Sequence, residues 1–146
     1  QLGVLADAQV AGDFTLPAGK AHVAELIGEA KADETIPVKS LVDAGAQVTL
    51  SSDWDVSSLN PFVGMQHALK REHQSVDLQT AVEMYTINGA YVMRQEKTTG
   101  SLTVGKQADF IVIDQDIFNI ARWKIPRTLV LQTVLGGKEV YRHNYF

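Results

Sequence analysis

The fold class is decided by residues 46–53, which read AQVTLSSD. Within this segment the apolar Val48 and Leu50 alternate with polar residues, and this period of two predicts a β-strand that ends at Asp53. Residues 3–10 form an earlier apolar segment that only two polar side chains interrupt. Such a segment is typical of a strand that is buried on both faces in a parallel sheet.

Helical patterns follow each predicted strand. Residues 21–30 place apolar side chains on one side of a helix. Pro37 suits the first position of another helix, and Gly45 provides the left-handed cap at its end. An Asn-Pro pair begins the helix predicted for residues 60–71, and an aspartate caps the longer helix predicted for residues 78–93. The order strand, helices, strand, helices predicts a parallel β/α arrangement.

After Gly100 the apolar period changes from about 3.6 residues to about 2, which indicates strands. The predicted strands cover residues 102–104, 108–114, 128–135 and 138–141. A Gly-Gly pair joins the last two and predicts a two-residue hairpin, because glycine adopts positive φ freely. The chain is thus predicted to be α/β, with a separate sheet at its C-terminal end. Two strand-helix units are too few to close a barrel, which needs eight.

Composition excludes several classes of protein. The 146 residues are 45% apolar and 21% charged, the balance of a globular domain. A net charge of -4 gives no basic surface for nucleic acid, and the lack of cysteine excludes disulfides and thiolate metal sites. No apolar run is long enough to span a membrane, so we expect a soluble protein and favour the cytoplasm.

The start at Gln1, directly before an apolar run, suggests that the sequence begins inside a longer protein.

Asp53 is the strongest candidate for chemistry by its position. It directly follows a predicted strand, and in parallel β/α folds functional side chains gather at that end of the sheet. Position alone favours a simpler role, in which the carboxylate caps a turn. For the neighbouring Trp54, packing is favoured over stacking against a substrate.

The histidines do not form a recognisable metal motif. The four are His22, His67, His73 and His143, and none belongs to a His-x-His or His-x-x-x-His pattern. Because His67 and His73 are six positions apart, a continuous helix would point them about 240° apart, and they could not share one ion. Each is interpreted as a surface histidine or as one that has a local hydrogen-bond partner.

Four segments together resemble one enzyme family. Residues 48–69 are similar to the last barrel strand and following helix of the amidohydrolase superfamily, especially amidohydrolase family 3. Residues 86–90, Thr-Ile-Asn-Gly-Ala, resemble the family's Thr-x-Asn-x-Ala helix. Residues 100–114 resemble the start of its C-terminal β domain, and residues 133–141 resemble its closing hairpin. The resemblance runs from about Pro37 onward, in the family's order.

This resemblance implies a fold and a site. Residues 1–96 would be the last two β/α units of a TIM-like (β/α)8 metal-dependent hydrolase barrel, and residues 97–146 would be strands of a small β-sandwich portion. The family's strand-eight metal-site aspartate falls on Asp53, which would contact the metal, take a proton from the metal-bound water and return it to the departing nitrogen. Trp54 is a candidate substrate contact. Family members often have proline where Asp55 stands, so the loop is expected to differ there.

The implied activity is hydrolysis of a non-peptide carbon-nitrogen bond in a small molecule, with a divalent metal, expected to be zinc, as the cofactor. A catalytic zinc needs about three protein ligands, and the family's other ligands are not recognisable in this sequence. The chain alone is therefore predicted to be an inactive fragment that binds no metal. The alternative is a non-catalytic module that self-associates. Unpaired strand edges favour a homo-oligomer in either case.

Overall fold

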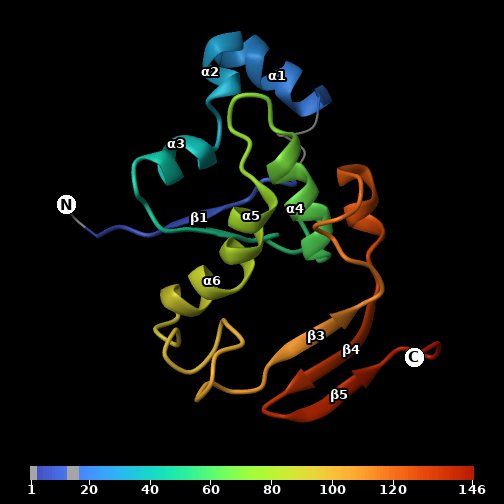
Figure 1. Cartoon of the computed structure of the whole chain (residues 1–146). Helices are drawn as coiled ribbons and strands as arrows, with labels where there is room; N and C mark the ends of the chain where they lie inside the picture. Colours follow the sequence, from blue (N-terminus) through green and yellow to red (C-terminus); the bar gives the residue numbers. More distant parts are fainter. Residues whose placement is uncertain (1–2, 13–16) are drawn as a thin grey trace.

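The computed structural model describes residues 3–12 and 17–146, which form a helical part around two parallel strands and a small antiparallel sheet (Figure 1). The elements in chain order are β1 (Ala6–Ala8), α1 (Pro17–Ile27), α2 (Glu29–Asp33), α3 (Val38–Asp43), β2 (Val48–Leu50), α4 (Pro61–Lys70), α5 (Leu78–Tyr85), α6 (Ile87–Val92), β3 (Phe110–Ile113), η2 (Arg122–Arg127), β4 (Val130–Leu135) and β5 (Lys138–Arg142). Within the described ranges, no helix has the length and apolar character needed to cross a membrane.

β1 and β2 are hydrogen-bonded in parallel, which confirms the prediction of a parallel sheet. Their register pairs Asp7 with Thr49 and Ala8 with Leu50. Since neighbouring residues of a strand point to opposite faces, Ala8 and Leu50 share one face, and Asp7 and Thr49 share the other. The two-stranded sheet therefore has an apolar face and a polar face.

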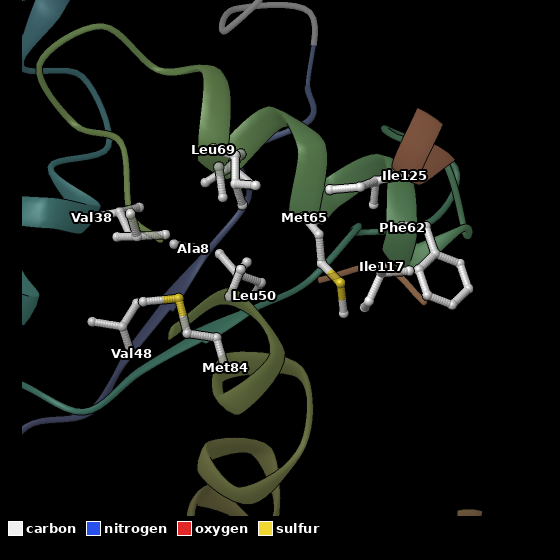
Figure 2. Packing of buried hydrophobic residues seen from close by; sticks show 14 residues of the cluster. Ala8, Val38, Val48, Leu50, Phe62, Met65, Leu69, Met84, Ile117 and Ile125 are labelled. Carbon is white, nitrogen blue, oxygen red and sulfur yellow. The ribbon is translucent and has the colours of Figure 1, made fainter. Parts of the chain in front are cut away.

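The apolar face of this sheet forms the main hydrophobic core together with buried side chains of α4 and α5 (Figure 2). Val48 of β2 and Met84 of α5 are each only 1% exposed. Met65 of α4 extends the core toward Ile117 and Ile125, which lie in the connection between β3 and β4. The core thus joins the helical part of the chain to the C-terminal part.

Three helix ends that depend on local residues form as predicted, whereas α3 begins at Val38, one residue after the predicted Pro37. The Asn60 side chain accepts a hydrogen bond from the backbone N–H of Phe62 at 2.9 Å and begins α4. Asp77 accepts from the N–H of Thr80 at 2.8 Å and begins α5. Gly45 follows α3 with a φ of 77°, the left-handed cap that the sequence required. These signals act over a few residues and need no distant partner.

The prediction of one long helix over residues 78–93 is wrong, because the helix breaks at Thr86 into α5 and α6. Thr86 has a φ of -124° and a ψ of -92°, outside the helical region. Beyond the break, the side-chain N–H of Asn88 donates to the Val48 carbonyl of β2 at 2.9 Å. The helix predicted for residues 21–30 is also divided, at Gly28, into α1 and α2.

The C-terminal strands form an antiparallel sheet in the order β3-β4-β5. The predicted hairpin between β4 and β5 is confirmed, with φ values of 57° at Gly136 and 76° at Gly137. The strand predicted for residues 102–104 is wrong, because the chain turns there and leaves Leu102 and Val104 exposed. No described strand pairs with this segment, so its apolar alternation has no sheet to join.

Candidate active site at the carboxyl ends of the parallel strands

Asp53 lies at its predicted place, just beyond the carboxyl end of β2. The strand ends at Leu50, although the next backbone N–H, of Ser51, still donates to the Ala8 carbonyl of β1 at 3.1 Å. The Asp53 carbonyl then accepts from the N–H of Val56 at 2.7 Å and forms a turn. The Asp53 side chain is exposed, and its carboxylate makes no hydrogen bond or ion pair with any described residue. The carboxylate is therefore accessible at this end of the sheet.

The backbone of Asp53 adopts the left-handed region, with a φ of 45°. Aspartate tolerates this region better than most residues because its short polar side chain can interact locally. In the turn, the carbonyl of the preceding Ser52 accepts both the N–H and the hydroxyl of Ser57, at 3.2 and 2.5 Å. Ser57 is 8% exposed, so a buried side chain anchors the turn that presents Asp53.

Asp7 is a polar residue of this region that the sequence analysis missed. It lies in the middle of β1, and its two carboxylate oxygens accept from the hydroxyls of Thr49 and Ser51, each at 2.8 Å. The available signal was an acidic residue within the apolar segment 3–10. Because aspartate is depleted in strands, such a residue calls for polar partners on the neighbouring strand. The polar face of the sheet thus continues into the segment that ends at Asp53.

Trp54 follows Asp53, and its side chain is 66% exposed. The sequence favours packing over substrate stacking for Trp54, and in the structure this side chain is not buried. Asp55 and Val56 are exposed as well, so the loop presents three consecutive exposed side chains after Asp53. Contact between Trp54 and a substrate stays a prediction.

The histidines do not complete a metal site around Asp53. His67 on α4 is half-buried, and its pKa is lowered mainly by burial and further by the charge of Lys70, while a hydrogen bond to the Val10 backbone opposes the shift. Within residues 3–12 and 17–146, no three His, Asp or Glu side chains lie close enough together to hold a metal ion. The described residues therefore do not fit a complete metal centre, and Asp53 offers a single carboxylate toward one.

Comparison with known proteins places this chain in a family. The Amidohydrolase family model matches residues 1–141. The chain is 33% identical over 110 residues to an N-substituted formamide deformylase of Arthrobacter pascens, a match that covers 69% of this chain and 20% of that protein. It is 30% identical over 100 residues to an imidazolonepropionase of Bacteroides fragilis, covering 68% of this chain and 24% of that protein. The chain therefore spans a quarter or less of the length of these relatives.

The fold agrees with this assignment. The structure of an adenosine deaminase from Xanthomonas campestris with bound zinc superimposes with a TM-score of 0.59 at 18% identity, and the match covers 91% of this chain and 36% of that chain. At this identity the likeness concerns the fold alone. The family match is stronger evidence, because it runs from the first strand into the last strand, β5, and includes the turn of Asp53. The chain is therefore a member of the amidohydrolase family.

Proposed function

We propose that this chain is the C-terminal part of a metal-dependent hydrolase that cleaves a non-peptide carbon-nitrogen bond in a small molecule. Family membership and the similarity to a deformylase and an imidazolonepropionase support this reaction class. One structural observation carries the proposal. Asp53, an exposed carboxylate, lies just beyond the carboxyl end of a parallel strand, where α/β enzymes of the barrel type place their catalytic groups.

Asp53 is assigned the role of general base. An exposed carboxylate can accept the proton of an attacking water and return it to the departing nitrogen, which requires one group within reach of both atoms. The left-handed backbone of Asp53 and the buried anchor Ser57 support this role, because they restrict the directions in which the carboxylate can point. Trp54, exposed beside it, is proposed to contact the substrate.

The complete enzyme is proposed to use a divalent metal, which we take to be zinc. A catalytic zinc needs about three protein ligands and an open position. Asp53 is the single carboxylate that we assign to the metal, and no three possible ligands lie together in the described residues, so the remaining ligands would come from other parts of the complete protein. The zinc in the adenosine deaminase of similar fold is consistent with this choice of metal.

We infer that the complete protein contains a (β/α)8 barrel, in which β1 and β2 are neighbouring strands and α4 and α5 cover their outer face. The parallel pairing, the apolar face toward the helices and the polar face away from them support this inference. The antiparallel sheet of β3, β4 and β5 would belong to a small β-sandwich portion, with residues 97–146 as its extent.

A second candidate function is self-association without catalysis, and the C-terminal sheet favours it. β5 is exposed along its whole length, and its Val140 and Tyr141 are 58% and 46% exposed. Exposed strand edges and apolar side chains attract partner chains. Light scattering of the purified chain over a range of concentrations tests this candidate. A homo-oligomer is expected, and a monomer at every concentration would contradict it.

The hydrolase proposal is tested with Asp53→Asn in the complete protein that contains this chain. Asparagine keeps the size of the side chain and tolerates the left-handed backbone, but it does not accept the proton. We expect kcat on N-formyl and cyclic amide substrates to fall by about 10²- to 10⁴-fold with an unchanged melting temperature.

Asp55→Asn is the matched control, because Asp55 is exposed in the same loop. This variant should retain the activity of the parent. Full activity of Asp53→Asn would remove Asp53 from the mechanism. For the chain by itself we expect neither turnover nor bound metal. Stoichiometric zinc together with amide hydrolysis by this chain would contradict the assignment of the other ligands to the rest of the protein.

A further inference from the structure

Asp7 links the two parallel strands on the face that the hydrophobic core does not use. Its Oδ1 accepts from the Thr49 hydroxyl and its Oδ2 from the Ser51 hydroxyl, each at 2.8 Å. Ala8 and Leu50, which adjoin these residues in the chain, point to the opposite face and are buried in the core. Asp7 is not part of this core. Both of its hydrogen bonds are with the segment that leads to Asp53.

Ser51 connects this carboxylate to the proposed base. It stands two residues before Asp53 and is held twice, since its N–H donates to β1 at 3.1 Å and its hydroxyl donates to Asp7. The carbonyl of the next residue, Ser52, accepts from the backbone and side chain of Ser57. The backbone is thus held by Asp7 on one side and by Ser57 on the other, up to the residue before Asp53.

Asp53 depends on this anchoring because of its backbone conformation, with a φ of 45°. A residue other than glycine keeps a left-handed conformation only where its surroundings hold it there. A small rotation at the end of β2 would redirect the carboxylate of Asp53. In an active site, a displacement of about 1 Å costs up to about 10²-fold in rate.

We propose that Asp7 is a positioning residue for Asp53 and acts through Ser51. It does not touch the reacting atoms but fixes the end of the strand, so that the Asp53 carboxylate points toward the substrate. This inference rests on the proposed function, in which Asp53 is the general base. A carboxylate is needed for this task because it offers a separate oxygen to each hydroxyl, whereas an amide of the same shape has a single acceptor oxygen.

Three variants separate positioning from simple stabilisation of the sheet. Asp7→Asn removes one of the two acceptor oxygens, and Ser51→Ala removes the link toward Asp53. Thr49→Val is the matched control, because it removes the other hydroxyl bond, of the same length, four residues before Asp53. If Asp7 only stabilises the strands, losing the Thr49 hydroxyl and losing the Ser51 hydroxyl should have the same effect on Asp53. If Asp7 positions Asp53 through Ser51, only the loss of the Ser51 hydroxyl should change Asp53.

The first measurement is the three-bond HN–Hα coupling of Asp53 in this chain, which NMR determines and which reports φ. We expect this coupling and the Asp53 amide shift to change in Asp7→Asn and Ser51→Ala, and to keep their wild-type values in Thr49→Val. Unchanged values in both Asp7→Asn and Ser51→Ala would overturn the proposal. If Asp7→Asn does not fold, Ser51→Ala decides the question alone.

The second measurement is the kinetics of the complete enzyme. Ser51→Ala and Asp7→Asn should lower kcat by about 10- to 100-fold and leave KM within about threefold, while Thr49→Val leaves both unchanged. If Asp53→Asn is inactive while Ser51→Ala and Asp7→Asn are fully active, positioning fails and the hydrolase proposal stands. If Asp53→Asn is fully active, the proposed function fails, and the coupling still shows whether Asp7 orients Asp53.

Discussion

The two sheets of this chain differ in what covers them. All three residues of β2 are buried, whereas all five residues of β5 are exposed. The parallel pair is packed against helices on its apolar face, and Figure 1 shows the antiparallel sheet extending away from those helices. We infer that burial of side chains against helices is the main stabilisation of the parallel sheet. The exposed strand β5 depends mainly on its hydrogen bonds to β4.

The segment between β3 and β4, which includes η2, attaches the antiparallel sheet to the main core more than the strands themselves do. Ile117 and Ile125, between β3 and β4, are 7% and 1% exposed and belong to the main core. The side-chain N–H of Asn60, at the start of α4, also donates to the Pro126 carbonyl of η2 at 3.4 Å. The carboxyl end of the parallel sheet and the C-terminal sheet are therefore joined through α4 and η2.

The sharpest test of this comparison is Ile125→Ala. Removing a buried isoleucine side chain costs about 2–5 kcal/mol of unfolding free energy, from lost transfer energy and the cavity left behind. The matched variant is Ile111→Ala on β3, whose side chain is 48% exposed and should cost less than about 1 kcal/mol. Urea unfolding followed by circular dichroism measures both. Equal losses would show that the sheet is packed as tightly as the connection.

The junction between the two regions is tested by Gly100→Ala. Gly100 has a φ of 81°, and an added Cβ would lie 2.6 Å from the Cβ of Ala90 and 3.0 Å from the Cα of Ile87, both in α6. Gly105 has a similar φ of 93° but no atom within 4 Å of an added Cβ. Gly100→Ala and Gly105→Ala should each lower the unfolding free energy by about 1–2 kcal/mol, because alanine is strained at a positive φ. Gly100→Ala should lose about 1–3 kcal/mol more, because its new methyl group overlaps α6.

This second test is read from the difference between the two alanine variants in thermal or urea unfolding. A larger loss for Gly100→Ala means that the segment before β3 is pressed against α6 and holds the two regions in a fixed arrangement. The same loss for Gly100→Ala and Gly105→Ala would mean that this segment can move away from α6 at little cost.

Sequence signals predicted those parts of the fold whose causes are local. The caps at Asn60 and Asp77 and the glycine hairpin of β4 and β5 each depend on residues within a few positions. The helix break at Thr86 was not predictable in this way, because it accompanies a contact from Asn88 to a strand residue 40 positions away. The prediction of a strand at residues 102–104 was wrong because alternation of apolar and polar residues does not reveal whether a neighbouring strand is there to pair with.

The candidate site shows the same division. Asp53 was found because it follows a strand and lies in a family motif that is continuous in sequence. Asp7 was missed because its partners Thr49 and Ser51 are 42 and 44 positions away, and only the register of β1 against β2 brings them together. A resemblance carried by motifs therefore locates the proposed base but not the residues that orient it.

A smaller effect is expected from Gly64→Ala inside the packed region. Alanine normally stabilises a helix relative to glycine by up to about 1 kcal/mol. In α4, however, the added methyl group would overlap the hydroxyl of Tyr85, whose pKa is raised to about 12 mainly by burial, with a contribution from Asp7. We expect Gly64→Ala to lower the unfolding free energy measured in urea by about 1–2 kcal/mol.

Gly89→Ala in α6 is the matched control, because an added Cβ there would meet no atom within 4 Å. This variant should leave stability unchanged or raise it. A loss of stability in Gly89→Ala would show that helix propensity does not govern that site.

The smallest effect concerns His67, which lies on α4 at the edge of the packed region. Its pKa is lowered from the usual value of 6.5, first by burial and then by the charge of Lys70. The unfolded chain therefore binds the His67 proton more readily than the folded chain, so stability is complete above the unfolded pKa and declines as the pH falls through the folded value.

Urea unfolding at several pH values between about 7 and 5 should show this decline in the parent and a weaker one in His67→Gln. Lys70→Gln should also weaken the decline, because it removes the positive charge that repels protonated His67. We therefore expect the acid sensitivity of the helical part to depend on His67 of α4. The same pH dependence in the parent and in His67→Gln would assign the acid sensitivity to other groups and separate it from the packing of α4.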